Sequence, residues 1–567
     1  MCVASECVEM TEQELDELLD RVQGAVSEQD YKKLEAIAGS LVYVTRLVED
    51  EGMTLRQLRS LISRKKSEKT RKVLERAGLA EGSRTAGGSE PPSESAPASA
   101  DPTVASTNDN KPKAKGHGRN GASAYRRAER LAIPHGQLES GASCPKCPKG
   151  KVYAKKHASQ LVRIIGQAPL QAKVYELERL RCNLCGEVFT AEPPAGVGDE
   201  KYDPSAKAMI GLLKYGTGLP FYRLDGLQAS LGVPLPDTTQ WDVVSGAAMS
   251  LRVVYDELVR QAAQGEVLYN DDTSMRILAL MKENQARLRA AGGKSEKVRT
   301  GIFTSGIVAT TDGEKIALFF TGRQHAGENL TDVLKKREAE REPPIQMCDA
   351  SSRNLPQELE VIVANCIVHG RRHFVDVIEN FPEQCRHVLE ALAEVYAVEA
   401  TARKEKLDPQ ARLELHQRSS RPVMDELHGW LKEQLDDKRV EPNSGLGKAT
   451  KYMLRHWEKL TLFLRKPGAP LDSNVVERSL KKVILHRKNA LFYKTENGAF
   501  VGDIFMSFIH TCELRKVDPL DYLTELLRHP DDLALRPEAW LPWTYRDTLA
   551  TMSGEEADPD QGLDRGG

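Results

Sequence analysis

Two adjacent carboxylates, Asp271 and Asp272, follow a short run of β-forming residues at positions 267–269. Apolar β-formers followed by a polar end are typical of a strand that carries side chains to the edge of a sheet. Neighbouring acids repel each other and lose hydration on burial, so a divalent metal ion is an obvious partner for them. The alternative is a solvated strand end whose aspartates serve in a turn or a helix cap.

Four cysteines form two matched pairs, Cys144 with Cys147 in CPKC and Cys182 with Cys185 in CNLC. Each pair can bring two thiolates to one tetrahedral Zn²⁺, and four thiolates close a structural site. We therefore expect one structural zinc ion, held in a ribbon with strand-like pieces at 161–165 and 172–175. The long chain lacks a secretion signal, so its ten cysteines favour metal or free thiols over disulfides.

A second Cys-x-x-His spacing occurs at Cys366 and His369, within CIVHGRRHF. The sequence contains no second ligand pair near it, so packing and DNA contacts are the favoured interpretation and metal binding is the alternative. Arg371 and Arg372 in the same segment are predicted to contact the DNA backbone.

The segment DSNVVERSLKKVILHRKN, which starts at Asp472, is predicted to form an amphipathic helix. Its apolar stripe consists of Val476, Leu480 and Val483. Another side carries Asn474, Glu477, Arg478, Lys481 and Lys488. An acid flanked by bases at a sheet edge suits the third carboxylate of a metal site and a grip on phosphate. Asn474-x-x-Glu477 also fits a capping box, which requires no active site.

The elements that must position these residues follow the order of an RNase H-like core. After the first strand come two more, joined at Asp312-Gly313, where Asp-Gly predicts a hairpin turn. A helix at 328–336 and a fourth strand at 345–348 follow, and that strand ends on Asp349. The first and fourth strands are neighbours in this fold, so Asp271 and Asp349 would meet.

The predicted fold class is multidomain α+β: an RNase H-like mixed α/β catalytic core with a large all-helical insertion, preceded by a Cys₄ zinc-binding module and a helical DNA-binding region. The predicted parts are a helical or coiled-coil region (1–78), a disordered basic linker (79–120), the zinc module (121–200), a helix-turn-helix-like region (201–265), the first part of the core (266–374), the helical insertion (375–470), the last core helix with C-terminal helices (471–530) and a tail (531–567).

Overall charge carries no information about a nucleic-acid partner, because the formal net charge is only −2. The distribution of charge along the chain does favour such a partner, since thirteen lysines and arginines but only two acids lie between Lys111 and Arg163. No apolar run approaches the roughly 18 residues that a membrane span needs. A cytoplasmic protein with no membrane partner is the expectation.

Several motifs together resemble the bacterial transposases of the insertion sequence 66 family, which are DDE-type enzymes. They are GHGRNGASAY, the two cysteine pairs, KYGTGLPFYRL, NDDTSMRIL, MCDASSRN, CIVHGRRHF and DSNVVERSLKKVILHRKN, spread between Gly116 and Leu527. Two departures stand out. Ser473-Asn474 occurs where the family often has two asparagines, and Ala350-Ser351 occurs where it often has Gly-Tyr.

The resemblance implies a catalytic triad of Asp271, Asp349 and Glu477 that holds two Mg²⁺ or Mn²⁺ ions for DNA cleavage and strand transfer. It leaves the role of Asp272 open. Four basic residues are predicted to bind DNA phosphates in this scheme: Arg478, Lys481, Arg487 and Lys488. The implied partners are double-stranded DNA at the terminal inverted repeats and at the target, further copies of the chain in a synaptic complex, and element-encoded helper proteins. The implied location is the bacterial cytoplasm, at the nucleoid.

Two other functions remain open at this point. The chain could be a DNA-binding regulatory protein that keeps the fold without catalysis, although all three acids are present. It could also be an RNase H-like nuclease that cleaves without joining.

Overall fold

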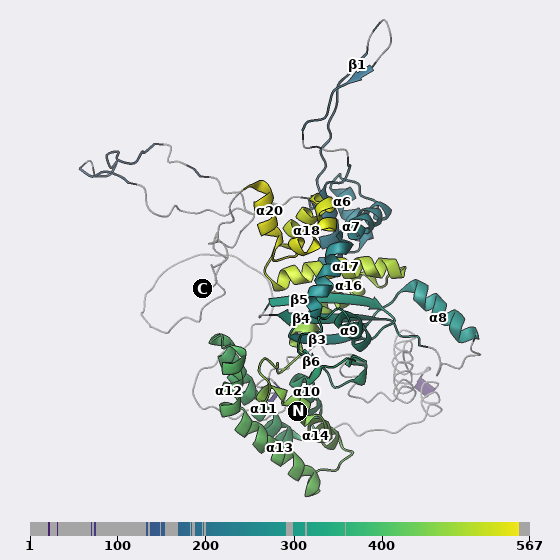
Figure 1. Ribbon diagram of the computed structural model, residues 1–567, viewed down its shortest axis with the longest axis vertical. Helices are drawn as coiled ribbons and strands as arrows, with labels where there is room; N and C mark the ends of the chain where they lie inside the picture. The colour runs from purple at the N-terminus through teal and green to yellow at the C-terminus, as the bar shows by residue number, and fades with distance from the viewer. Residues whose placement is uncertain are drawn as a thin grey trace. The chain divides into compact units, whose positions relative to one another are not determined.

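The computed structural model describes residues 137–147, 149–153, 168–181, 183, 188–195, 197, 200–290, 299–311, 314–357 and 359–554, with residues 21–22, 26, 31, 70, 73–74 and 132–133. These residues form a mixed α+β structure, as predicted (Figure 1). The predicted linker, Cys182, Cys185 and the chain after residue 554 lie outside the described residues.

A five-stranded mixed sheet runs in the order β5-β4-β3-β6-β7. Its strands are β3 (Val267–Ser274), β4 (Phe303–Thr311), β5 (Glu314–Gly322), β6 (Ile345–Cys348) and β7 (Ile362–Asn365). The predicted hairpin is confirmed, since β4 and β5 pair antiparallel from Thr311 opposite Glu314 onward. β3 pairs with β6 in parallel, and β6 pairs with β7 in parallel. The first and fourth strands are therefore neighbours, as expected.

Two strand predictions need correction. β3 does not end at its acids but continues through Asp271 and Asp272 to Ser274. β7 was not anticipated, because its four residues carry too short a pattern to separate a strand from the start of the next helix. In the zinc module, residues 172–175 form no strand, and the strands found there are β1 (Arg179–Arg181) and β2 (Val188–Thr190).

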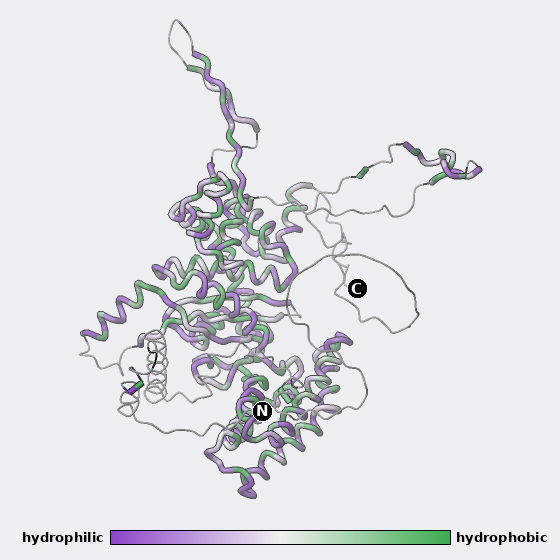
Figure 2. The backbone as a smooth tube through the Cα atoms, turned by 180° about the vertical axis from the view of Figure 1, so that it is seen from behind, coloured by the Kyte–Doolittle hydropathy of each residue, from purple (hydrophilic) through white to green (hydrophobic). Residues whose placement is uncertain are grey.

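The chain divides into two units, and the first takes Glu266–Asp271, Glu342–Val475 and the N-terminal segment up to Gly82. The helices of this unit are η4 (Ser352–Asn354), α10 (Ile367–Val377), α11 (Pro382–Lys404), α12 (Pro409–Ser419), α13 (Arg421–Asp436), α14 (Gly445–Arg455), α15 (Trp457–Leu460) and η5 (Leu462–Leu464). Leu389, Leu392, Leu427 and Leu431 are buried in its core, as their helical spacing predicts. The helices alternate hydrophobic and hydrophilic residues, as amphipathic helices do (Figure 2).

A buried charged cluster joins α11 to α12 in the first unit. Glu399 of α11 is only 4% exposed and accepts hydrogen bonds from Arg412 Nε (2.8 Å), His416 Nε2 (3.0 Å) and Arg403 Nε (2.8 Å). Burial by itself raises the pKa of Glu399, but the hydrogen bonds from His416 and Arg412 outweigh it and lower the pKa to about 2. The charge therefore stays on the carboxylate inside the helical unit.

The second unit takes Ser83–Gly265, Asp272–Arg341 and Val476–Gly567. Its helices are α5 (Pro204–Gly211), the π-helix η2 (Leu212–Gly216), α6 (Phe221–Ser230), α7 (Asp237–Ala263), α8 (Leu278–Ala290), α9 (Ala326–Leu334), α17 (Glu496–Leu514), α18 (Pro519–Arg528), α19 (Pro530–Leu535), η6 (Pro537–Trp540) and α20 (Tyr545–Ser553). α16 (Asn474–Ala490) begins in the first unit and continues in the second. Among the described residues, no helix combines the length and apolarity needed to cross a membrane.

α17 covers β5, which is the last strand at one side of the sheet (Figure 1). Backbone N–H groups of alternate residues in β5 donate to side chains of α17: Thr321 to Asp503 Oδ2 (2.7 Å), Phe319 to Ser507 Oγ (3.0 Å) and Ala317 to Thr511 Oγ1 (3.0 Å). Four residues of helix rise about 6 Å and two residues of strand about 6.7 Å, so the two repeats match over this length.

Asp503 is expected to make stability depend on pH. Burial raises the pKa of its carboxyl to about 7, although hydrogen bonds from Thr321 oppose the shift. A raised pKa in the folded state means that this contribution to stability is full below about pH 4 and is lost as the pH rises towards 7. The Asp503→Asn substitution should therefore raise the free energy of unfolding by about 2–3 kcal/mol more at pH 8 than at pH 5.

Urea unfolding at the two pH values measures this difference. The exposed Asp242 of α7 supplies the control, because Asp242→Asn should change stability equally at both. An equal effect of Asp503→Asn at pH 5 and pH 8 would contradict the prediction.

Candidate active site

The pairing of β3 with β6 brings Asp271 and Asp349 to the same part of the sheet. Tyr269 lies opposite Met347 in the parallel register, and each aspartate stands two residues further along its chain. Both carboxylates lie close enough to Cys348 to affect its thiol. Burial, with the charges of Asp349 and Asp271, raises the pKa of Cys348 to about 12. The structure thus brings together the two acids that the sequence predicted to meet.

The turn after β6 fixes the Asp349 side chain. Asp349 Oδ1 accepts hydrogen bonds from the backbone N–H of Ser351 (3.0 Å) and from Asn354 Nδ2 (2.5 Å). Asn354 belongs to the short helix η4, which follows directly. The Ala350-Ser351 pair therefore sits in a turn that the aspartate itself stabilises.

A buried amide network supports both acids and was not predicted. Asn270, next to Asp271, accepts a hydrogen bond from Gln346 Nε2 (2.8 Å) and donates to the backbone oxygen of Asn354 (2.7 Å). Gln346 Nε2 also donates to that oxygen (2.6 Å), and all three side chains are completely buried. The sequence signal that could have predicted this network is an amide residue within an apolar strand, because a buried polar group requires a hydrogen-bond partner.

Asp272 has a different environment from Asp271. Its side chain is only 3% exposed, and its Oδ2 lies 2.8 Å from His325 Nδ1. An ionised carboxylate can only accept, so Nδ1 is the donor. Asp272, the neighbour of Asp271, is thus hydrogen-bonded to His325 inside the fold. His325, 53 residues away in sequence, is a partner that no local motif could identify.

His325 is itself held in place at the start of α9. Its backbone N–H donates to Glu328 Oε2 (2.7 Å), and the Phe303 ring lies 4.2 Å from the imidazole, centroid to centroid. Arg299 donates to Glu328 (2.7 Å), and this bond lowers the pKa of Glu328 to about 2. The capping residues of α9 therefore orient the imidazole that binds Asp272.

Glu477 lies in the first turn of α16, as predicted. The predicted apolar stripe is confirmed, because Val476, Leu480 and Val483 are all buried. The Asn474 backbone N–H donates to Asp472 Oδ1 (3.1 Å), so the Asp472 side chain accepts a hydrogen bond from the first residue of the helix. The predicted DNA contacts Arg478, Lys481 and Lys488 are exposed, whereas Arg487 is half-buried and bonds to Thr273 and Ser274.

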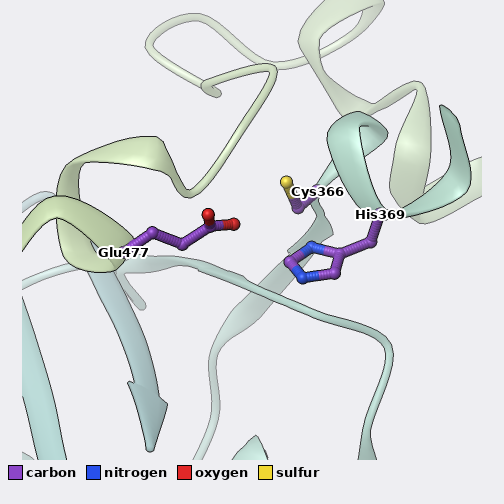
Figure 3. Close-up of side chains that lie close together, drawn as sticks. All are labelled: Cys366, His369 and Glu477. Carbon is purple, nitrogen blue, oxygen red and sulfur yellow. The ribbon is translucent and has the colours of Figure 1, made fainter. Parts of the chain in front are cut away.

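Cys366 precedes α10 and His369 lies in its first turn. The Cys366 thiol, the His369 imidazole and the Glu477 carboxylate each offer a ligand atom, and these atoms lie within 4.8 Å of one another (Figure 3).

Two arginines follow His369 in α10. Arg372 is exposed, but Arg371 is only 8% exposed and donates to Thr70 Oγ1 (3.2 Å). The DNA contacts of Arg371 and Arg372 stay predictions.

The first half of the predicted zinc site is a tight turn. The Cys144 N–H donates to the Gly150 oxygen (2.7 Å), and the Cys147 N–H points at Cys144 Sγ (3.5 Å). That bond lowers the pKa of the Cys144 thiol, which favours the thiolate form that binds metal. β1 ends at Arg181 and its antiparallel partner β2 begins at Val188, whereas Cys182 and Cys185 lie outside the described residues.

The Asp272–His325 contact predicts a measurable coupling energy. His325→Leu removes a donor from a nearly buried carboxylate and should lower the free energy of unfolding by about 1–3 kcal/mol. His325→Asn, whose amide can donate from a similar position, should lose less. A double-mutant cycle of His325→Leu with Asp272→Asn, followed by urea unfolding, tests the contact. Strictly additive effects would show that the two side chains do not interact.

Sequence comparisons show which known proteins the chain resembles. The profile described as "Transposase IS66 family" matches residues 200–500, which contain all three predicted acids. The chain is 27% identical over 416 residues to uncharacterized protein y4jD of Sinorhizobium fredii (strain NBRC 101917 / NGR234), covering 70% of this chain and 78% of that one. It is 26% identical over 440 residues to uncharacterized protein y4hP of the same strain, covering 72% and 74%. The match over more than half of its length establishes that the chain belongs to the IS66 family of transposases.

Proposed function

We propose that the protein is a DDE-type transposase that binds the ends of a bacterial insertion sequence and performs metal-dependent cleavage and strand transfer. The observation that carries this proposal is the parallel register of β3 and β6, which brings Asp271 and Asp349 together. The order β5-β4-β3-β6-β7, with an antiparallel hairpin on one side and two parallel pairings on the other, supports an RNase H-like core.

The donor set fits hard divalent cations. Asp271 and Asp349 are half-buried carboxylates, and carboxylate oxygens suit Mg²⁺ or Mn²⁺. Asp271, Asp349 and Glu477 would hold two such ions, which when bound supply Lewis-acid activation of the attacking oxygen and stabilise the departing one. The hydrogen bonds from Ser351 and Asn354 hold the Asp349 carboxylate in one orientation, which preorganises it for this role.

The exposed cations of α16 would hold the DNA. Arg478, Lys481 and Lys488 can each neutralise a phosphate, and Arg372 can do the same from α10. The zinc module and the helices α5 to α7 would recognise the element ends. Strand transfer requires two ends held together, so the active form is proposed to be an oligomer. Element-encoded proteins would assist it, and it would act on DNA in the bacterial cytoplasm.

Strand transfer on the protein's own element ends tests the proposal. Joining should require Mg²⁺ or Mn²⁺, and Asp271→Asn, Asp349→Asn and Glu477→Gln should each lower its rate by about three orders of magnitude or more, as loss of a catalytic group does. The exposed Glu340 supplies a matched control, because Glu340→Gln should leave the rate unchanged.

Each other outcome selects a different function. Joining that survives Glu477→Gln would remove Glu477 from the triad. End binding without cutting, with helper proteins supplied, would identify a regulatory DNA-binding protein. Cutting without joining would identify a nuclease.

Zinc content provides a separate test of the Cys₄ module. The wild-type chain should retain one zinc ion after dialysis. Cys144→Ser or Cys182→Ser should lose it, because a site built from four thiolates binds zinc weakly when one thiolate is missing. Cys2→Ser, which lies outside both pairs, is the control. Elemental analysis of the purified variants measures the ratio. Zinc retained in full by Cys182→Ser would assign the metal to other residues.

A further inference from the structure

A basic pocket opens in the second unit, where the end of β3 meets the end of α16. It has a volume of about 470 Å³. Its lining residues are Ser274, Met275, Arg276, Arg487, Lys488 and Leu491. Pockets of roughly 300–1,000 Å³ hold small-molecule ligands. Three of the six lining side chains are cationic and none is acidic, so the pocket suits an anionic ligand.

One of the cations is fixed and two are exposed. Arg487 Nη1 donates to Ser274 Oγ (2.9 Å), to Thr273 Oγ1 (3.2 Å) and to the Ser274 backbone oxygen. These bonds hold its guanidinium against the strand. Arg276 and Lys488 are exposed to solvent and can reach a ligand. A fixed cation with two adjustable ones is a suitable arrangement for a phosphate group.

The remaining wall is apolar, and the backbone beside it is hydrogen-bonded to the residues after β3. Leu491 is 57% exposed and has a φ of 68°, a left-handed conformation that leucine rarely adopts. The next residues pair with the strand end, since the Tyr493 N–H donates to the Arg276 oxygen (2.9 Å) and the Leu278 N–H to the Tyr493 oxygen (2.9 Å). The left-handed residue ends α16, as is common after a helix, and it leaves an exposed apolar side chain beside cations, which suits a ligand with an apolar face.

β3 links this pocket to the proposed chemistry. Ser274 follows Asp271 by three residues on the same strand, which is about 10 Å of extended chain. In B-form DNA successive nucleotides of one strand rise about 3.4 Å along the axis. A nucleotide in the pocket would therefore lie within a few positions of a bond held at Asp271.

We propose that this pocket binds one unpaired nucleotide of the element end, next to the cleaved bond. The nucleotide's phosphate lies between Arg276 and Lys488, and its base packs against Leu491 and Met275. The inference rests on the proposed transposase function and adds a step to it, because the base must leave the duplex stack.

A base-paired backbone would not need this pocket. Phosphates on the outside of a duplex are bound by exposed side chains, and a pocket of about 470 Å³ with an apolar wall adds nothing to that contact. Taking a base out of the stack costs a few kcal/mol, which contacts to its face and its phosphate can offset. The pocket supplies both kinds of contact.

The test places 2-aminopurine, whose fluorescence rises when it leaves the base stack, at each of the last few positions of the element end. The full-length protein is added with Ca²⁺ to bind without cutting. One position should give a several-fold rise, and Leu491→Ala should abolish most of it. Leu485→Ala is the control, since Leu485 is another exposed leucine of this region (44%) and does not line the pocket.

Rescue supplies a second readout. Leu491→Ala and Lys488→Ala should slow joining, and an abasic residue at the responding position should restore part of the rate, because no base then has to be extracted. Lys494→Ala, an exposed lysine outside the pocket, should have no effect. Normal joining without any fluorescence rise would overturn the pocket's role and leave the transposase proposal standing. Failure to bind or cut the element ends at all would overturn both.

Discussion

The in-register parallel pairing of β3 and β6 is the constraint on which the candidate site depends. A slip of one residue would turn Asp271 to the other face of the sheet, away from Asp349, because side chains alternate along a strand. The amides of Asn270 and Gln346 oppose such a slip, since both also bind the backbone of Asn354 beyond the end of β6. The network therefore specifies the register as well as satisfying buried polar groups.

The acids that stabilise the fold differ in burial from the acids of the candidate site. Glu399 and Asp503 are almost fully buried and bind partners inside the protein. The hydrogen bonds of Glu399 keep it charged, whereas burial raises the pKa of Asp503 to about 7. Asp271 and Asp349 are only half-buried. Asp272 belongs with the structural acids, although it is next to Asp271 in sequence. Strand alternation explains this division, because adjacent residues face opposite sides of a sheet.

The sequence predicted the elements with strong periodicity and the meeting of Asp271 with Asp349. Alternation and the Asp-Gly turn identified β4 and β5, and the apolar stripe identified α16. It missed the contacts that join distant segments, such as His325 to Asp272, because nothing local marks such a pair. It also did not show that Arg371 is buried, since a basic residue on an amphipathic helix can face either way. The length of β3 escaped prediction because aspartates are unfavourable in strands and pairing with neighbours overrode that preference.

The ladder of hydrogen bonds between α17 and β5 covers one edge of the sheet. An exposed edge strand invites a strand from another molecule, which is a common route to association and to aggregation. Here the N–H groups of Ala317, Phe319 and Thr321 already donate to one helix. An incoming strand would have to displace α17 and three hydrogen bonds from buried groups. Addition of a further strand to the sheet is therefore closed at this edge, because it would require α17 to leave β5 first.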